Sequence, residues 1–512
     1  MKINQKSKLF LLLFSAVSSF LILMICTRSS FLYPMNNWVD AQCFFTVGKA
    51  MANGQIVYRD IFEQKGVLLY FLHMLTYFVS HTTFIGVFFL EVMAGTAFLF
   101  INIKILTLYT DIRFAVFSAV LCSMSVYSSM AFCEGDSAEE LCLPLLAYAL
   151  YLSTKAFKNG KWLTGKQLFC VGIVSACVLW IKYTMLGFFI GWIIVPLLWL
   201  IKEKQWKAIG KTFLYIILGV FVVTLPIILY FAVNHALSDL WEVYFYKNIF
   251  GYSHIDKDLS LPQKIVVIIQ KTAMLTKYAF LNNLQRFTGL LLIGLIGFLF
   301  MKGKKQKLSI YIMFLTSTLF IYGGGNVFDY YPLPLSVFSV FGCIPPYLLI
   351  RWIIRKKYRQ NTWWKDFQNP IYTVITGIFT IVIALCLSVK FSYNIDFMKY
   401  QKEDTPQYRF KEIIQQETNP TLLQFGGLDG GFYSVCDIVP NCKYFCGLNI
   451  NLPEIKEGQQ QYLDNGEGMF VVVYAGELHH DNYELVATEK FDDSRMKGIY
   501  NLYRLRSIAK KE

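Results

Sequence analysis

The chain has 512 residues, of which 55% are hydrophobic and 17% aromatic, and its formal net charge is +14. This hydrophobicity exceeds that of ordinary soluble domains and predicts membrane-spanning helices. The positive charge does not indicate a nucleic acid partner, because it lies in short loops beside apolar runs. Lysine and arginine at such places set the topology and contact anionic lipid headgroups.

Apolar runs long enough to cross a bilayer recur from the N-terminus to about residue 390. The stretch Val67–Val79 is too short to cross and predicts an interfacial or re-entrant helix. Every Lys/Arg cluster then falls on one side, which the positive-inside rule makes cytoplasmic. We therefore expect a multi-pass plasma-membrane protein with a cytoplasmic N-terminus and an extracytoplasmic C-terminus. About eleven spans are predicted, the first of them uncleaved, at residues 9–26, 84–108, 114–132, 139–157, 167–181, 184–201, 212–233, 287–301, 308–322, 332–350 and 371–389.

The composition changes after Lys390, where the chain becomes mixed and polar and is long enough for a small domain. We divide the chain into a transmembrane domain, residues 1–390, and an extracytoplasmic α/β domain, residues 391–512. In the second domain the pattern predicts a helix at 407–416 and strands at 421–425, 469–474 and 498–505.

Three of the cysteines, Cys436, Cys442 and Cys446, cluster in this C-terminal part. An oxidising outer compartment would permit a disulfide among them, and the sequence does not choose the pair. A metal site there is disfavoured, because no histidine lies nearby at ligand spacing.

Charged and aromatic groups are densest in the first predicted outer loop, residues 27–66. A carboxylate at the membrane surface suits a general base acting on an acceptor hydroxyl. Arginine and lysine further along the loop suit a bound phosphate. From spacing alone, a solvated loop in which these acids and bases pair with one another is an equal alternative.

This loop resembles the first outer loop of the C-type (GT-C) integral-membrane glycosyltransferases. These enzymes use polyprenyl-phosphate sugars and include the protein O-mannosyltransferases and the lipid A aminoarabinose transferases. Members carry an acid soon after the first span, then a tyrosine–acid pattern, then a Lys-Pro-Pro or Lys-Gly-Pro turn before an aromatic helix. The counterparts here are Asp40, Tyr58-Arg59-Asp60 and Lys65-Gly66-Val67. The chain departs from the pattern at Val67, where proline is usual, and at Ala41, where a second acid is frequent.

The resemblance extends over roughly residues 1–350. The family often has an acidic cluster before the fourth span, a lysine after the fifth and an aromatic pair before the tenth. Here the same places hold Glu134, Asp136 and Glu139, then Lys182, then Tyr330 and Tyr331. The fold implied is an all-α polytopic GT-C-like bundle with juxtamembrane helices, followed by the small α/β domain.

The resemblance implies inverting transfer of a sugar from a polyprenyl-phosphate donor to a glycan, lipid or protein acceptor outside the cytoplasm, with 27–66 as the catalytic loop. It assigns the general base to Asp40 and the donor phosphate to Arg59, Lys65 and Lys182. The first loop has no Asp-x-Asp motif, so we expect no cofactor and no obligatory divalent ion, although Asp136 and Glu139 could hold one. Substrate-binding candidates are Tyr58, Asp60, Glu63, Glu134, Asp136, Glu139, Tyr330 and Tyr331.

Other classes stay open on the sequence. A transporter or flippase of lipid-linked sugars would also have many spans, but it predicts charges deep in several spans and Gly/Pro-broken helices, which are sparse here. A cell-surface polysaccharide polymerase or ligase would place its key groups in one large late loop, for which 234–285 is the candidate. A scaffold or receptor would use the C-terminal part for binding.

Overall fold

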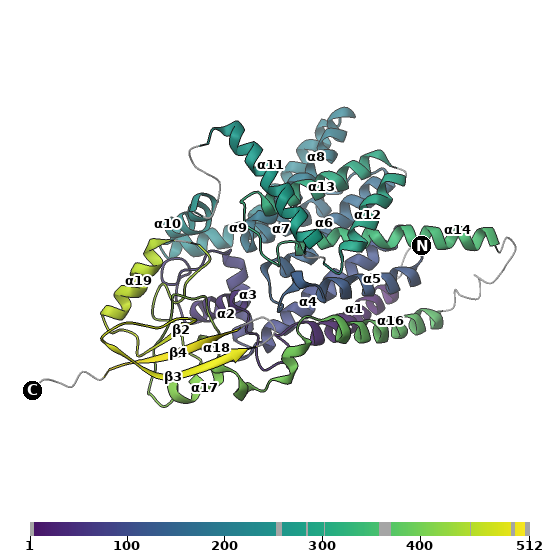
Figure 1. Ribbon diagram of the computed structural model, residues 1–512. Coiled ribbons are helices and arrows are strands. Elements are labelled where there is room, and N and C mark those ends of the chain that lie inside the picture. The colour runs from purple at the N-terminus through teal and green to yellow at the C-terminus, as the bar shows by residue number, and fades with distance from the viewer. Residues whose placement is uncertain are drawn as a thin grey trace, which may run out of the picture.

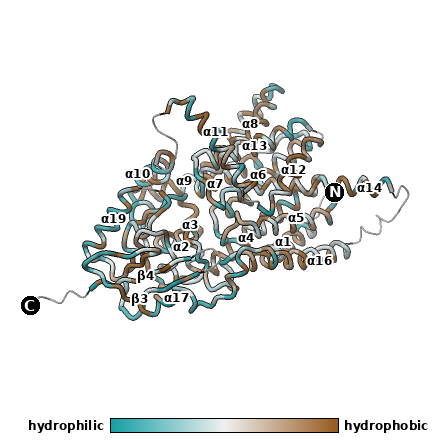
Figure 2. Tube along the Cα trace, viewed as in Figure 1, coloured by the Kyte–Doolittle hydropathy of each residue, from teal (hydrophilic) through white to brown (hydrophobic). Residues whose placement is uncertain are grey.

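The computed structural model describes residues 5–251, 259–282, 285–301, 303–357, 370–450, 452–492 and 497–506. Most of the chain forms a bundle of helices, and a small sheet lies at the far end from α14 (Ile344–Lys357) (Figure 1). Apolar residues dominate the bundle, whereas the end with the sheet is more polar (Figure 2).

Helices cover all of the predicted spans. Within the described residues, six segments are long and apolar enough to cross a membrane: Ser7–Cys26, Ile85–Leu106, Tyr183–Lys202, Trp206–Val233, Leu333–Ile354 and Val374–Phe391. The helices at the predicted spans are α1 (Gln5–Cys26), α4 (Ile85–Leu106), α5 (Ile112–Tyr127), α6 (Ala138–Asn159), α7 (Gly165–Ile181), α8 (Leu186–Lys202), α9 (Trp206–Val233), α12 (Thr288–Phe300), α13 (Lys304–Tyr322), the 3-10 segment η5 (Leu333–Cys343) continued by α14, and α16 (Pro370–Phe391).

Side-chain caps mark where several of these helices begin and end. The carboxylate of Asp111 accepts hydrogen bonds from the amides of Arg113 and Phe114 at the start of α5. The hydroxyl of Ser137 accepts from the amide of Glu140 at 2.9 Å and starts α6. These groups satisfy amides that a helix leaves unpaired in its first turn.

The short apolar stretch forms α3 (Val67–Tyr77), as predicted, but the loop before it is partly helical. Helix α2 (Val39–Ala52) occupies the middle of the predicted loop 27–66, and its residues Asp40–Ala50 are all buried. Its polar residues Gln42, Thr46 and Lys49 are buried, so α2 lacks the solvent-exposed polar face that marks an amphipathic surface helix.

The second large predicted loop, 234–285, is also largely helical in its described part, and residues 252–258 and 283–284 lie outside that part. It contains α10 (Leu237–Asp239), the π-helical segment η3 (Leu240–Gly251), α11 (Leu261–Lys277) and η4 (Tyr278–Asn282). A capping box formed by Ser260 and Gln263 begins α11.

The C-terminal unit consists of a four-stranded sheet with the helices α17 (Pro406–Ile414), α18 (Phe432–Val435) and α19 (Pro453–Asp464). The strands lie in the order β1-β2-β4-β3. The first pair is parallel and the other two pairs are antiparallel. The strands are β1 (Leu422–Phe425), β2 (Phe470–Tyr474), β3 (Tyr483–Asp492) and β4 (Lys497–Leu505).

Helices α2 and α3 lie between the sheet and the helical bundle (Figure 1). They pack closely on each other at Gly48, where a Cβ atom would lie 2.6 Å from the amide nitrogen of Met74. The α2–α3 pair therefore joins the two parts of the molecule.

Candidate functional site

The first turn of α2 carries Asp40, which is 7% exposed. Within the part of the chain that the structure describes, the Asp40 carboxylate has no hydrogen-bond or ion-pair partner. Just before it, the Trp38 ring packs edge-on against Tyr330 with centroids 5.5 Å apart. The candidate base is thus sheltered, its neighbour Trp38 contacts the turn before η5, and its carboxylate oxygens have no partner among the described residues.

A second part of the site is the segment from Glu63 to Gly66. One oxygen of Glu63 accepts from the amide of Lys65 at 2.8 Å, and the other lies 3.8 Å from the Lys65 ammonium. Burial raises the pKa of Glu63, while the charge of Lys65 opposes that rise and nearby Asp40 adds to it. Asp40, Glu63 and Lys65 therefore lie within electrostatic range of one another.

The glycine of this segment brings it against the end of α7. The amide of Gly66 donates to the carbonyl of Ile181 at 3.1 Å. A Cβ atom at Gly66 would lie only 2.0 Å from the carbonyl oxygen of Trp180, so no other residue fits there. This contact sets Lys65 beside Lys182, which comes directly after α7.

Lys182 forms an ion pair with Glu139, in the first turn of α6. Its ammonium also lies 4.9 Å from the ring centroids of both Tyr330 and Tyr331. Two electron-rich ring faces and a carboxylate hold this cation in place. Lys182 is therefore in direct contact with Glu139 and the tyrosine pair, and Tyr330 in turn contacts Trp38, two residues before Asp40.

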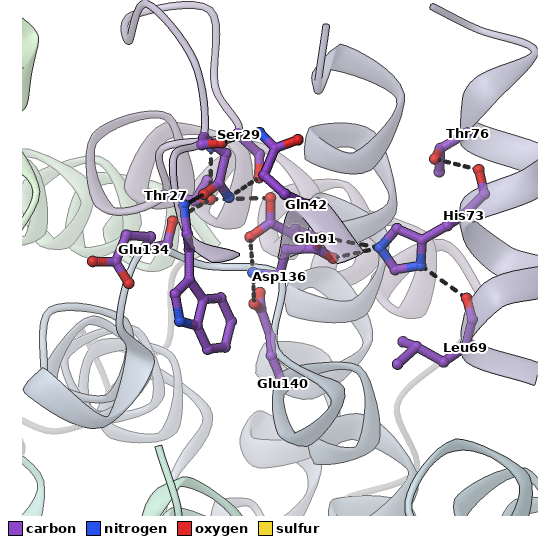
Figure 3. Close-up of polar contacts among 12 residues, drawn as sticks. Thr27, Ser29, Gln42, Leu69, His73, Thr76, Glu91, Glu134, Asp136 and Glu140 are labelled. Carbon is purple, nitrogen blue, oxygen red and sulfur yellow. Dashed lines mark hydrogen bonds and ion pairs between the residues drawn. The ribbon is translucent and has the colours of Figure 1, made fainter. Parts of the chain in front are cut away.

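Asp136 belongs to a different group, which Figure 3 shows. Its carboxylate is bonded to Nε2 of His73 at 2.9 Å, and Nδ1 of His73 lies 2.8 Å from the carbonyl of Leu69. The Asp136 amide donates to Glu91 and to Glu140, at 2.9 Å each. We name His73, Glu91, Asp136 and Glu140 the acid–histidine cluster, all of whose members are 0–1% exposed.

His73 and Asp136 each shift the pKa of the other in the direction that favours an ion pair. Burial alone would lower the pKa of His73, but the Asp136 carboxylate raises it above its ordinary value. Burial raises the pKa of Asp136, and the charge of His73 acts against that rise. The pair stabilises a junction between α3 and the loop before α6.

The backbone of that loop is unusual at two neighbouring positions. Gly135 has φ of +92°, and a Cβ atom there would lie 2.1 Å from Oγ1 of Thr27. Asp136 has φ of +66°, a conformation that aspartate tolerates better than most residues. Thr27 in turn donates to Glu91 at 3.0 Å, so the loop is fixed against the end of α1.

Several predicted site residues lie apart from this centre. Arg59 is exposed and pairs with its neighbour Asp60, whose pKa is lowered by that hydrogen bond. Tyr58 is fully buried between the rings of Phe231 and Tyr244, and its hydroxyl donates to the carbonyl of Lys65 at 2.6 Å. Arg59 and Asp60 therefore form a pair near the surface, and Tyr58 is part of the packed interior beside Lys65.

Glu134 meets the end of α1 through its backbone. Its carbonyl accepts from the amide of Arg28 at 2.7 Å and from the hydroxyl of Thr27 at 3.2 Å. The guanidinium of Arg28 is buried, bonded to Asn394 at 3.0 Å and stacked 4.1 Å from the Phe397 ring.

The sequence did not single out His73 as part of the site. His73 resembles any interfacial histidine in the pattern of its helix. The sequence signal that could have revealed this cluster was Glu91, because a charged residue within a span usually faces the bundle interior and requires partners. Among the described residues, no group of three or more His, Cys, Asp or Glu side chains is arranged to hold a metal ion.

Comparison with known families gives a direct match over most of the transmembrane part. Residues 1–322 match the family described as "Putative competence-induced protein Ccs4 N-terminal domain". The chain belongs to this family. No curated protein sequence matches the chain.

Two solved structures of ArnT from Cupriavidus metallidurans are similar in fold. The one bound to undecaprenyl phosphate has a TM-score of 0.57 and 9% sequence identity, covering 96% of this chain and 98% of that one. The apo structure has a TM-score of 0.56 and 10% identity, covering 92% of this chain and 93% of that one. The chain of this Ccs4 family member therefore has the GT-C fold, over both the helical bundle and the C-terminal sheet.

Proposed function

We propose that this protein transfers a sugar from a polyprenyl-phosphate donor to an acceptor hydroxyl on the outer side of the plasma membrane. The observation that carries the proposal is that Asp40, Lys65 and Lys182 lie near one another in a GT-C fold. Asp40 acts electrostatically on Glu63, the ion-pair partner of Lys65, and Gly66 is bonded to Ile181, the residue before Lys182. The similar ArnT structure bound to undecaprenyl phosphate supports a polyprenyl-phosphate ligand.

The proposed base is Asp40. Its uncommitted carboxylate, sheltered at the start of α2, can accept the proton of an acceptor hydroxyl. The hydroxyl oxygen then attacks the anomeric carbon from the face opposite the phosphate. The bond from that carbon to the phosphate oxygen breaks, the phosphate keeps the electron pair, and the configuration inverts.

The proposed phosphate ligands are Lys65 and Lys182. Each ammonium has three donors, so it can keep its glutamate, Glu63 or Glu139, and still donate to a phosphate oxygen. Two cations that are already fixed lose little freedom on binding, and they stabilise the charge on the departing phosphate. Because Arg59 is exposed and paired with Asp60, we propose that it contributes less to phosphate binding than the two lysines.

The test uses purified protein and a panel of polyprenyl-phosphate sugars. We expect the wild type to transfer or release sugar and Asp40→Asn to lose it by about 10²–10⁴-fold, while still binding donor. Asp464→Asn is a matched control, because Asp464 is exposed and bonded to His480 and Gln460. Near-normal turnover by Asp40→Asn would exclude it as the base. Tight donor binding without any turnover by the wild type would favour a transporter of lipid-linked sugars.

Metal dependence is tested in the same assay. We propose that no divalent ion is required, so removal by EDTA should leave turnover unchanged. A loss that Mg²⁺ or Mn²⁺ restores would contradict this.

The proposed orientation places the N-terminus in the cytoplasm and the C-terminal unit outside. Cysteine introduced at exposed Asp481 should react with a membrane-impermeant maleimide on intact cells, whereas cysteine at exposed Lys204 should react only after lysis. The wild type, with its own cysteines, is the blank. The reverse labelling pattern would invert the topology.

A further inference from the structure

One face of α2 is bound to the C-terminal unit along its length. Residues one turn apart on this face each contact a different part of that unit. The contacts are Gln42 with Ser434 at 2.6 Å, Cys43 with Cys446 at 3.6 Å, Thr46 with Asp429 at 2.6 Å, and Lys49 with Asp437 at 2.8 Å and the carbonyl of Tyr433 at 3.0 Å.

The central contact joins Thr46 to Asp429, both of which are 0% exposed. The Thr46 hydroxyl donates to one carboxylate oxygen of Asp429, and the amide of Gly431 donates to the other at 2.8 Å. Burial raises the pKa of Asp429 to about 6, so the charged form is costly at this place. Burying a charged carboxylate with few hydrogen-bond partners costs free energy, so a gain in stability alone does not explain Asp429 at this place.

The opposite face of α2 is fixed as well. Gly48 lets α2 approach α3 closely, and the Phe44 ring packs on the rings of Tyr70 and His73. With one face bound to α3 and the other to the C-terminal unit, α2 has no free rotation or sliding.

Asp40 and Thr46 lie on one unbroken helix, six residues apart. At about 1.5 Å rise per residue, their backbones are separated by roughly 9 Å along the axis. A rotation or shift of α2 at Thr46 therefore moves the carboxylate of Asp40, and a displacement of about 1 Å can cost roughly 10²-fold in rate.

We propose that Thr46 and Asp429 are positioning residues, through which the C-terminal unit sets the position of Asp40 for the reaction. This inference rests on the proposed function, because it takes Asp40 as the base. It makes the C-terminal unit part of the catalytic apparatus even where it contacts no substrate.

The first test separates positioning from folding by conservative variants. Thr46→Val has nearly the same shape but no hydroxyl, and Thr46→Ser keeps the hydroxyl. We expect Thr46→Val to lower kcat about tenfold with the donor KM unchanged, and Thr46→Ser to stay within about twofold of the wild type. Asp429→Asn should lower kcat in the same direction, whereas Asp464→Asn should not. Equal kcat for Thr46→Val and the wild type would overturn the inference.

The second test follows the position of α2 without using catalysis. The thiols of Cys43 and Cys446 are 3.6 Å apart and both are buried. Diamide, an azo oxidant, takes two electrons and two protons from the pair, forming the disulfide while it becomes the hydrazine. With Cys436 and Cys442 replaced by serine, we expect slower crosslinking in Thr46→Val than in the wild type or Thr46→Ser.

Together, kcat and the crosslinking rate show whether the proposed function or the positioning role is wrong. If the wild type shows no turnover while Thr46→Val still slows crosslinking, the proposed function is overturned and the coupling of α2 to the C-terminal unit is upheld. If the wild type turns over and Thr46→Val changes neither kcat nor crosslinking, the proposed function stands and the positioning role is overturned.

Discussion

The acid–histidine cluster and the group of charged residues around Asp40 lie near each other, and they differ in how their polar atoms are paired. In the acid–histidine cluster, His73 and Asp136 use their charges on each other, and Glu91 and Glu140 bind a backbone amide. In the group around Asp40, the carboxylate has no hydrogen-bond or ion-pair partner among the described residues, and Lys65 and Lys182 pair with Glu63 and Glu139. Charged groups that pair with one another stabilise the fold, whereas groups with unpaired polar atoms can bind a substrate and react with it.

The largest effect is expected in the acid–histidine cluster. His73→Phe keeps a ring but leaves Asp136 as an unpaired buried charge, so we expect the free energy of unfolding to fall by about 3–5 kcal/mol. Denaturation by SDS in mixed micelles measures this. His81→Phe is the control, because His81 is 55% exposed and its loss should cost about 0.5 kcal/mol or less. If His73→Phe were as stable as the wild type but had impaired turnover, the acid–histidine cluster would instead be assigned a part in the reaction.

A smaller effect is expected from Asp429, whose pKa of about 6 exceeds the ordinary value of 3.8. Between these two pH values the folded state binds more protons than the unfolded state, so stability falls as pH rises and is constant above. The contribution is roughly 3 kcal/mol at most, since one pKa unit corresponds to about 1.4 kcal/mol.

Thermal unfolding of the wild type and of Asp429→Asn between pH 4 and 7 isolates this contribution. The difference between the two should shrink toward low pH, where the wild-type carboxyl is protonated. A constant difference across this range would mean that Asp429 stays charged in the folded state.

The smallest effect is expected among the basic residues. Lys182→Ala and Lys65→Ala should each weaken binding of the lipid-phosphate donor by about tenfold, which corresponds to about 1.4 kcal/mol. Arg59→Ala should change it less than twofold, because its partner Asp60 is at the surface. An equal loss of donor affinity in all three variants would show that the donor phosphate also contacts Arg59.

The sequence predicted the helices that depend on long apolar runs and the strands that depend on local patterns. Strand β3 escaped prediction because it lies at the edge of the sheet, where Glu484, Glu489 and Lys490 interrupt the apolar alternation. Helix α2 was missed for another reason, because its polar residues are buried and it has no solvent-exposed polar face.

The candidate site likewise has one part that the sequence predicted and one part that it did not. Asp40, Lys65 and Lys182 could be proposed from a family resemblance, but the closeness of the Lys65 segment to Lys182 could not, because it depends on Gly66 packing against the end of α7. The partnership of His73 with Asp136 joins residues 63 positions apart, and no local pattern encodes such a pairing. The GT-C fold was predicted and is present, while the roles of these residues stay predictions.

The bond between Thr46 and Asp429 joins residues 383 positions apart. During synthesis the helix with Asp40 enters the membrane region early, while its partner is made near the end of the chain. At about 5–20 residues per second, the wait is roughly 20–80 s. If the proposed roles hold, a nascent chain would have its lysine-bearing helices in place well before it is competent to react, and truncated products would be inactive.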